Sequence, residues 1–204
     1  NTPILNTKEL EDIGYNIAIF PGGAVRFLAA AAAEYYESLV ATSAQTNGAV
    51  AKFGYFDRFT LSARIKIKAG DNGTILSKKV PAKQGLGYSL DLTKDGMVQL
   101  NLVKRWLDDA LRVETVEPVT SSHVLVTYDG ARQSSGIQFF VDGQRVAHKA
   151  NLDYLNQTFE TEEPLLVGEG NDDFTGEVEG IAVFDRVLDD DEIRAIAEPS
   201  SVDA

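Results

Sequence analysis

Acidic and amide side chains gather in one loop-like segment, Gly168–Asp173, which reads GEGNDD. This segment offers oxygen ligands from Glu169, Asn171, Asp172 and Asp173. Hard cations such as Ca²⁺ take several oxygen ligands from loops of this kind. The spacing differs from the D-x-D-x-D-G calcium loop, so a solvated turn is the alternative. The segment therefore predicts calcium as a cofactor, bound by these side chains.

Aromatic side chains offer a second kind of chemistry, the stacking of a flat ring on a sugar face. Trp106, the sole tryptophan, stands in the polar, turn-like stretch KRWLDD, and residues 151–163 form a long stretch without clear periodicity that contains Tyr154 and Phe159. Long loops of β-sandwiches often form a binding edge. We therefore expect Trp106, Tyr154 and Phe159 to contact a ligand, with packing in the core or in loops as the alternative.

The sequence shows no convincing set of side chains for catalysis. Glycoside hydrolysis needs two carboxylates about 5–10 Å apart, and Glu177 and Glu179 share a strand face, but two in-phase acids on a strand are commonplace. His123 and His148 stand in strand-like runs without convergent partners for metal binding or catalysis. The chain has no cysteine, which excludes disulfides, thiolate metal sites and cysteine nucleophiles. We therefore expect that the protein is not an enzyme.

Composition limits the remaining classes. The chain has 204 residues, a net charge of −12 and 44% hydrophobic residues, enough for one β-sandwich and an appendage. The negative charge argues against a nucleic-acid partner, which needs a basic surface. No apolar run approaches the length of a membrane span. No signal peptide is visible at Asn1, so we interpret the chain as an excised domain. The composition does not indicate where in or outside the cell the protein is located.

Alternation and turn residues predict antiparallel strands over most of the chain from residue 53 onward. Residues 61–68 alternate apolar and polar side chains with period two. Asp142-Gly143 lies between IQFFV and QRVAH and predicts a type I′ hairpin, because both central residues of that turn need positive φ. Further Asp-Gly pairs at 95–96 and 129–130 mark other turns. The pattern indicates a mainly β fold.

A short helix is predicted near the C-terminus. Asp189 is placed to cap it and Glu192 to reach back, as in a capping box. Leu188 and Ile193 have the spacing of a hydrophobic staple. We expect one or two helical turns after the last strand.

These segments together resemble the laminin-G-like branch of the concanavalin A-like jelly rolls. The resemblance covers about residues 53–197 and rests on HVLVTYDG, FFVDGQRV, EPLLVGEG and DFTGEVEGIAVFDRVLDDDEI. A tryptophan often precedes the His-Val strand in that family, and Ser121 stands there instead. The residues that fill the family's C-terminal pattern are Phe174, Gly176, Val178, Glu179, Ile181, Val183, Phe184, Arg186, Leu188, Glu192 and Ile193.

The resemblance implies an antiparallel jelly-roll β-sandwich domain at residues 49–204. It also implies a location outside the cytoplasm or on the cell surface, and a place in a large multidomain bacterial protein. Jelly rolls of this kind often hold one calcium ion, which agrees with the oxygen-rich loop.

The first 48 residues have a different pattern and form a separate predicted unit, an α/β appendage. A short apolar strand at 16–20 ends at Pro21, and an alanine-rich helix follows at 24–41. Residues 1–45 resemble the last strand and helix of the phosphoenolpyruvate mutase/isocitrate lyase superfamily of barrels. The family's magnesium-binding acids lie in earlier barrel units, and a single βα unit cannot close a barrel. This resemblance therefore implies no chemistry.

Two explanations account for the junction near residues 44–49. We favour a natural or engineered chimera, in which a barrel fragment is joined to a sandwich, because the ordered match is long. The alternative is a convergent N-terminal segment that caps the sandwich.

The sequence therefore favours a non-catalytic binding or adhesion module that recognises a glycan or a protein. A structural accessory domain, or an engineered chimera without a ligand, is the alternative. A glycoside hydrolase or a lyase remnant is the least favoured hypothesis.

Overall fold

The computed structural model describes residues 51–120 and 123–198. Residues 1–48, with the predicted βα appendage, lie outside this part. The described elements are β1 (Phe59–Lys66), β2 (Gly73–Lys79), β3 (Gly87–Leu92), β4 (Val98–Arg105), β5 (Asp109–Thr115), β6 (His123–Tyr128), the 3₁₀ turn η1 (Ser134–Gly136), β7 (Ile137–Val141), β8 (Gln144–Val146), β9 (His148–Tyr154), β10 (Leu166–Val167), β11 (Glu177–Phe184) and α3 (Asp190–Ala197).

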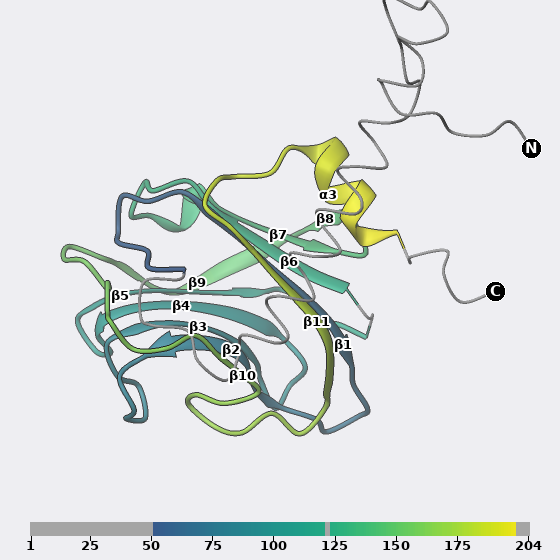
Figure 1. The fold of residues 1–204 in the computed structure, drawn as a ribbon, viewed down its shortest axis with the longest axis horizontal. Coiled ribbons are helices and arrows are strands. Elements are labelled where there is room, and N and C mark those ends of the chain that lie inside the picture. The colour runs from purple at the N-terminus through teal and green to yellow at the C-terminus, as the bar shows by residue number, and fades with distance from the viewer. Residues whose placement is uncertain (1–50, 121–122, 199–204) are drawn as a thin grey trace, which may run out of the picture. The chain divides into compact units, whose positions relative to one another are not determined.

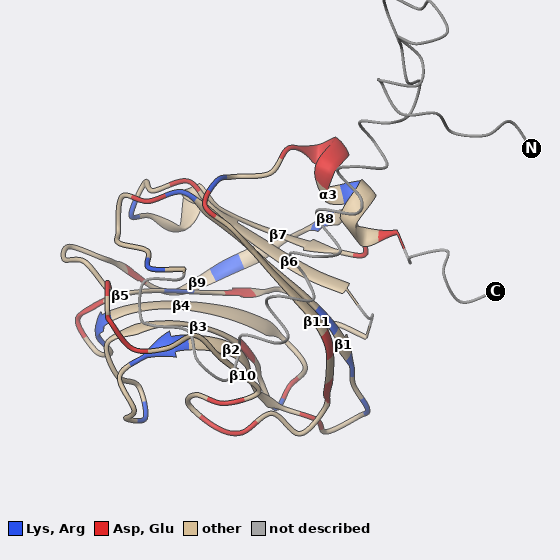
Figure 2. Ribbon diagram, viewed as in Figure 1, with Lys and Arg blue, Asp and Glu red and all other residues tan. Residues whose placement is uncertain are grey.

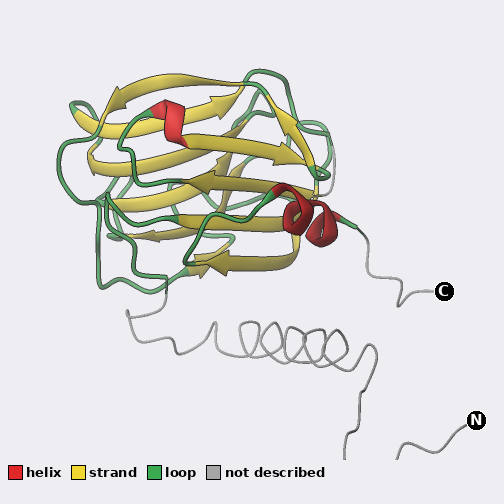
Figure 3. Ribbon diagram, turned by 90° about the horizontal axis from the view of Figure 1, so that it is seen from above, coloured by secondary structure: helices red, strands yellow, loops and turns green. Residues whose placement is uncertain are grey.

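The strands form two antiparallel sheets that pack face to face as a sandwich (Figure 1). The five-stranded sheet has the order β11-β1-β6-β7-β8, and the six-stranded sheet has the order β10-β2-β3-β4-β5-β9. Viewed from above, the strands run roughly along one direction, and α3 lies beside them (Figure 3). The predicted fold, an antiparallel jelly-roll sandwich with a short C-terminal helix, is confirmed.

Strand alternation decides which side chains enter the core. In β1, Leu61, Ala63 and Ile65 are fully buried in the main hydrophobic cluster. In β3, Tyr88 and Leu90 enter the same cluster from the opposite sheet. Since successive side chains of a strand point to opposite faces, the intervening polar residues point away from the core.

The predicted hairpin at Asp142-Gly143 is confirmed. Both residues have positive φ, 47° and 73° respectively, as a type I′ turn requires. The turn joins β7 to β8, which pair with Val141 opposite Gln144. This hairpin forms one edge of the five-stranded sheet.

Helix α3 covers part of the outer face of the five-stranded sheet. Asp189 accepts hydrogen bonds from the backbone N–H groups of Asp191 and Glu192, and the side chain of Glu192 accepts from the backbone of Asp189, which completes the predicted capping box. Leu188 and Ile193 are buried together, in a second apolar cluster that includes Leu125 and Phe140 of the sheet. The helix is therefore held by packing as well as by its cap.

The region after β8 differs from the expectation. We predict a long loop over residues 151–163, but residues 151–154 belong to β9, which pairs with β5 through residues such as Leu152 and Arg112. The hydrogen bonds of the sheet edge stabilise a strand that the mixed polar sequence does not indicate. Within residues 51–120 and 123–198, no helix is long and apolar enough to cross a membrane.

Candidate functional site

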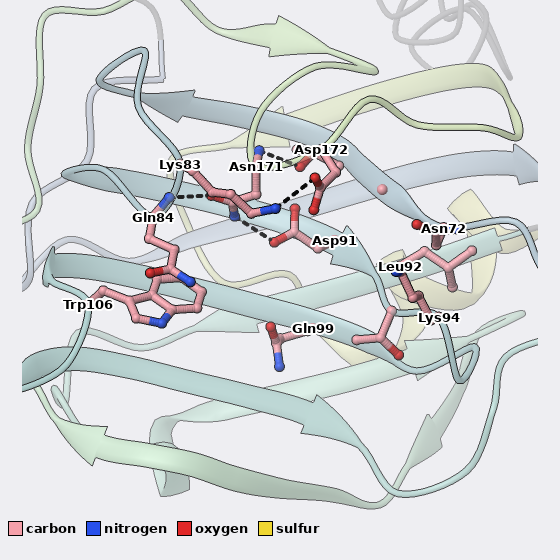
Figure 4. A pocket seen from close by; sticks show the side chains of 13 residues that line it. Asn72, Lys83, Gln84, Asp91, Leu92, Lys94, Gln99, Trp106, Asn171 and Asp172 are labelled. Atoms are coloured by element: carbon pink, nitrogen blue, oxygen red, sulfur yellow. Dashed lines mark hydrogen bonds and ion pairs between the residues drawn. The ribbon is translucent and has the colours of Figure 1, made fainter.

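A cavity of about 180 Å³ lies on the outer face of the six-stranded sheet, over β3 and β4 (Figure 4). Most of the residues that line it are polar, one is aromatic, and none belongs to a catalytic motif predicted from the sequence. The residues that line it are Asn72, Gly73, Thr74, Lys83, Gln84, Asp91, Leu92, Thr93, Lys94, Gln99, Trp106, Asn171 and Asp172.

Strand register explains why polar side chains meet here. Asp91 of β3 stands opposite Thr74 of β2 and Gln99 of β4, so the three side chains share the outer face. The next rung along this face contains Ser89 and Asn101, also cross-strand partners. Three neighbouring strands thus present their polar side chains to one side of the sheet.

One wall of the cavity is the segment that follows β10, which crosses the start of β2 at close range. The backbone N–H of Thr74 donates to the carbonyl of Asp172 (2.8 Å), and the N–H of Asn171 donates to the Thr74 hydroxyl (2.9 Å). Gly73 has φ of +114°, and a Cβ there would lie 2.2 Å from the carbonyl oxygen of Asp173. Glycine at position 73 is therefore what lets the two segments approach each other.

The carboxylate of Asp91 is the centre of a hydrogen-bond network in the cavity. Its Oδ2 atom accepts from the Ser89 hydroxyl (3.0 Å) and from the side-chain amides of Asn101 (2.7 Å) and Asn171 (3.0 Å). Burial raises the pKa of Asp91, and the neighbouring side chains of Thr74, Asn171 and Ser89 oppose that rise. Its Oδ1 atom is buried and accepts no hydrogen bond of normal geometry within the described chain.

Trp106 forms another wall, beside Gln84 in Figure 4. The guanidinium carbon of Arg112 lies 4.4 Å from the centre of the Trp106 ring, within the range of a cation–π contact. Burial lowers the pKa of Arg112, while the charge of Glu114 opposes this change. The stacked pair holds the indole in place over the sheet.

Two further polar atoms of this face lack hydrogen bonds within residues 51–120 and 123–198. They are Oδ1 of Asn101, an acceptor, and Nε of Arg112, a donor. Asn101 and Arg112 are cross-strand partners on β4 and β5. Buried polar atoms usually have a hydrogen-bond partner, so this face carries capacity that the described protein residues do not use.

The structure separates the three aromatic residues predicted to bind a ligand. Trp106 lines the cavity, as described above. Tyr154 is 59% exposed at the end of β9 and is not among the lining residues. Phe159 is a correction: its side chain is fully buried in the core, with its ring nearly perpendicular to that of Tyr88, and is closed to a ligand.

The four residues predicted to bind calcium are spread over different contacts. The Asn171 amide oxygen accepts from the backbone N–H of Gln84 (2.9 Å), and Asp172 forms an ion pair with Lys83 (2.9 Å). Glu169 uses its carbonyl to accept from Ser77, and Asp173 is exposed. Among the described residues, no three acidic, histidine or cysteine side chains are grouped to hold a metal. Calcium binding by this loop stays a prediction.

The other residues considered for chemistry lie away from the cavity. Glu177 and Glu179 are exposed on β11, in the other sheet, and Glu179 forms an ion pair with Lys66. His123 is buried on the outer face of the five-stranded sheet, where its Nε2 atom lies 2.8 Å from the hydroxyl oxygen of Ser62.

The sequence reasoning missed Lys83, Asp91 and Gln99 as site residues. A signal for two of them was present, because Asp91 and Gln99 occupy polar positions in strands whose alternate residues are strongly apolar. The sequence pattern does not indicate the strand pairing that places Asp91 beside Gln99. It also does not indicate that the chain crosses back and brings Asn171 to the outer face of these two strands.

Comparisons with solved structures agree with this architecture. The sialidase CBM40 of Ruminococcus gnavus has 16% identity and a TM-score of 0.50, over 70% of this chain and 84% of that one. A heptameric pentraxin of Limulus polyphemus has 16% identity and a TM-score of 0.50, over 72% of both chains. The binding domain of Paraclostridial Mosquitocidal Protein 1 has 15% identity and a TM-score of 0.50, over 72% of this chain and 38% of that one. At such low identities, the structural likeness shows a similar fold alone.

Sequence comparison extends the result to a family. No curated protein sequence matches the chain. The predicted barrel resemblance of residues 1–45 receives no support, since the matching family model begins at residue 41. That model, described as the concanavalin A-like lectin/glucanases superfamily, matches residues 41–194 in its laminin G form. The chain therefore belongs to the laminin G branch of the concanavalin A-like lectin/glucanase superfamily.

Proposed function

We propose that the protein is a non-catalytic carbohydrate-binding module that holds its ligand in the cavity over β3 and β4. The observation that carries this proposal is the wall of Trp106 beside polar lining side chains, among them Asp91, whose Oδ1 atom has no hydrogen-bond partner within the described residues. A sugar presents both an apolar ring face and several hydroxyl groups, so it matches an aromatic plane flanked by acceptors and donors.

The comparisons support the same class. One R. gnavus CBM40 structure is described as bound to α2,3-sialyllactose, with 16% identity and a TM-score of 0.50 to this chain. The similar structure of Paraclostridial Mosquitocidal Protein 1 is also described as a binding domain. A location outside the cytoplasm or on the cell surface, within a larger bacterial protein, belongs to this proposal and is supported by the family.

Binding is favoured over hydrolysis by the arrangement of the acids. Of the two carboxylates at the cavity, Asp172 is paired with Lys83, and Asp91 is held by three donors on one oxygen. A glycosidase needs one protonated acid and one free carboxylate on opposite sides of the scissile bond. The acids here serve to position neighbouring side chains.

Trp106→Ala tests the proposal on the full 204-residue chain. Leu107→Ala is the matched control, because Leu107 is the adjacent residue, is 85% exposed and does not line the cavity. Binding is measured on a panel of immobilised glycans, with circular dichroism to confirm folding. We expect Trp106→Ala to weaken binding about tenfold or more, since an aromatic contact contributes about 1 kcal/mol beyond its buried area.

Two results would contradict the proposal. One is the absence of binding to every glycan on the panel by the unaltered chain. The other is equal binding by Trp106→Ala and Leu107→Ala, which would place any glycan contact elsewhere on the molecule.

A further inference from the structure

We infer that the cavity accepts a single uncharged sugar residue at the end of a glycan, recognised through its hydroxyl groups. This inference rests on the proposed function and narrows it to a class of ligand. Three features of the cavity carry it: the balance of charges, the kind of hydrogen-bonding atoms that remain unused, and the size of the space.

The charged residues that line the cavity balance one another. They are two lysines, Lys83 and Lys94, and two aspartates, Asp91 and Asp172. Lys83 is already paired with Asp172 at 2.9 Å. An anionic sugar would therefore meet Lys94 and, at the same time, the carboxylate of Asp91, whose repulsion offsets the attraction.

The cations just outside the lining are engaged as well. Arg112 lies against the ring of Trp106. The ammonium group of Lys79 donates to the backbone carbonyls of Val80 and Ala82. Strong recognition of a carboxylate requires a guanidinium or ammonium group that faces the ligand and is not held by other contacts. Neither Arg112 nor Lys79 presents such a group to the cavity.

The unused atoms at the cavity are mainly acceptors. Oδ1 of the lining residue Asp91 accepts no hydrogen bond of normal geometry within the described chain. Its neighbour Asn101 also has an unpartnered Oδ1 atom, but it is 1% exposed and does not line the cavity. Gln99 donates its amide N–H to Glu114 (2.9 Å), which leaves its carbonyl oxygen on the cavity side of the strand. Acceptors of this kind match the O–H donors of neighbouring sugar hydroxyls and not the oxygens of a carboxylate.

The size of the cavity favours one sugar residue. Its volume of about 180 Å³ is below the ~300–1,000 Å³ of pockets that enclose drug-sized ligands. In Figure 4, Gln84 and Trp106 stand at one end and Leu92 and Lys94 at the other, with Asn171 and Asp172 along the side. A residue inside a long glycan would need a groove open at both ends, whereas a terminal residue does not.

The sole tryptophan provides a direct readout, because the intrinsic fluorescence of the chain reports on Trp106. The 204-residue chain is titrated with uncharged methyl glycosides of glucose, galactose, mannose and N-acetylglucosamine. The acidic probes are N-acetylneuraminic acid and glucuronic acid. β-Cyclodextrin, a ring of glucose residues without a chain end, tests the size argument. We expect a saturable change with at least one uncharged glycoside and none with the acids or with β-cyclodextrin.

Asp91→Asn tests the role of the acceptor. The asparagine oxygen can still accept from Ser89, Asn101 and Asn171, while the new NH₂ group replaces the acceptor at Oδ1 by a donor. We expect about tenfold weaker binding of the uncharged glycoside, as for loss of a hydrogen bond to a charged group. Asp173→Asn is the matched control, since it makes the same change of charge at an exposed position of the adjacent wall segment, and it should change affinity less than twofold.

A second variant guards against a folding defect in Asp91→Asn. Gln99→Ala removes a half-buried acceptor at the cavity and should also weaken binding of the same glycoside, with an unchanged melting temperature. If neither variant weakens binding while both stay folded, the assignment of acceptors is wrong.

The remaining outcomes separate this inference from the proposed function. Binding of acidic sugars alone, with tighter binding by Asp91→Asn, would overturn the inference and leave a carbohydrate-binding module. Binding of β-cyclodextrin as tight as that of methyl glucoside would overturn the terminal-residue argument. Absence of binding to every soluble and immobilised glycan would overturn both.

Discussion

The outer faces of the two sheets of this sandwich differ. The outer face of the five-stranded sheet is covered by α3, whose Leu188 and Ile193 pack on Leu125 and Phe140. The outer face of the six-stranded sheet carries a polar cavity instead, bordered by loops and by Trp106. Figure 2 shows acidic residues at the start of α3 and basic residues on several strands of the six-stranded sheet.

This difference suggests that similar polar residues stabilise the fold on one face and contribute to binding on the other. Both faces hold buried polar groups. On the covered face, Arg64 donates to the carbonyls of Ile196, Ala197 and Glu198 at 2.8–3.1 Å and so caps the end of α3, although Nδ1 of His123 has no hydrogen-bond partner within the described residues. On the other face, hydrogen-bonding capacity is left over beside a cavity. Changes on the covered face should therefore alter stability, and changes at the cavity should alter binding.

The largest effect on stability is expected from Ile193→Ala. The side chain is 1% exposed between α3 and the sheet, and its truncation should cost about 2–4 kcal/mol through lost burial and a residual cavity. Urea denaturation measures the change, and glycan affinity should be unaltered. Arg194→Ala, on the exposed side of the same helix, should change stability by less than about 0.5 kcal/mol. A weakened glycan affinity in folded Ile193→Ala would contradict the separation of the two faces.

Gly73→Ala should affect stability and binding together. Its Cβ would lie 2.2 Å from the carbonyl oxygen of Asp173, so the wall segment must move. Gly70→Ala is the control, because Gly70 also has positive φ, +94°, but open space around it. We expect both variants to lose about 1 kcal/mol from the backbone conformation, and Gly73→Ala to lose a further ~1–2 kcal/mol together with the fluorescence response. Equal behaviour of the two variants would show that the close crossing does not shape the cavity.

We expect low pH to reduce the free energy of unfolding through protonation of His123, on the face covered by α3. Burial, together with the charge of Arg64, lowers its pKa from 6.5 to about 4, and the charge of Asp142 opposes the shift. The unfolded chain therefore binds the proton first, so this contribution to stability is present above pH 6.5 and is lost as the pH falls toward about 4. We expect a loss of about 2 kcal/mol after allowance for solvent screening.

The measurement is the free energy of unfolding from pH 7 to pH 4 for the parent chain and for His123→Gln. The variant should show a shallower decline, since glutamine does not titrate. His148→Gln serves as the control at a half-buried histidine. The same slope in the parent chain and in His123→Gln would exclude His123 as the source.

The smallest effect is expected from Lys83→Ala. The ion pair of Lys83 with Asp172 is largely exposed, at 65% and 63% of the side chains, so its loss should change stability by less than about 0.5 kcal/mol. Because it unpairs Asp172 at the cavity, the variant should bind acidic sugars no better than the parent chain. A large loss of stability in Lys83→Ala, persisting at 1 M salt, would show that the cavity wall is structural.

Local features were predictable where they depend on residues that are close together in the sequence. The Asp142-Gly143 hairpin depends on positive φ at two adjacent residues, and the capping box of α3 on residues three positions apart. The staple of Leu188 and Ile193 is confirmed for the same reason. Trp106 was recognised as a candidate because its sequence surroundings are polar.

Features that depend on distant partners were not predictable. Phe159 is closed to a ligand because it packs on Tyr88, which lies far from it in the sequence. Residues 151–154 form a strand because β5 offers them an edge. Asp91 looks like an ordinary polar position of a strand until Asn101 and Asn171 donate to it from another strand and from the wall segment.

The amino-acid sequence by itself determined that this chain folds as an antiparallel β-sandwich with a capped terminal helix. Alternation, Asp-Gly turns and caps act between residues that are close in the chain, so they can be read without a structure. Only the tertiary structure decided which outer face is covered and which holds a cavity. That choice depends on strand pairing and on the crossing of β2 by a segment nearly a hundred residues away, where Asn171 bonds Thr74 with a sequence separation of 97.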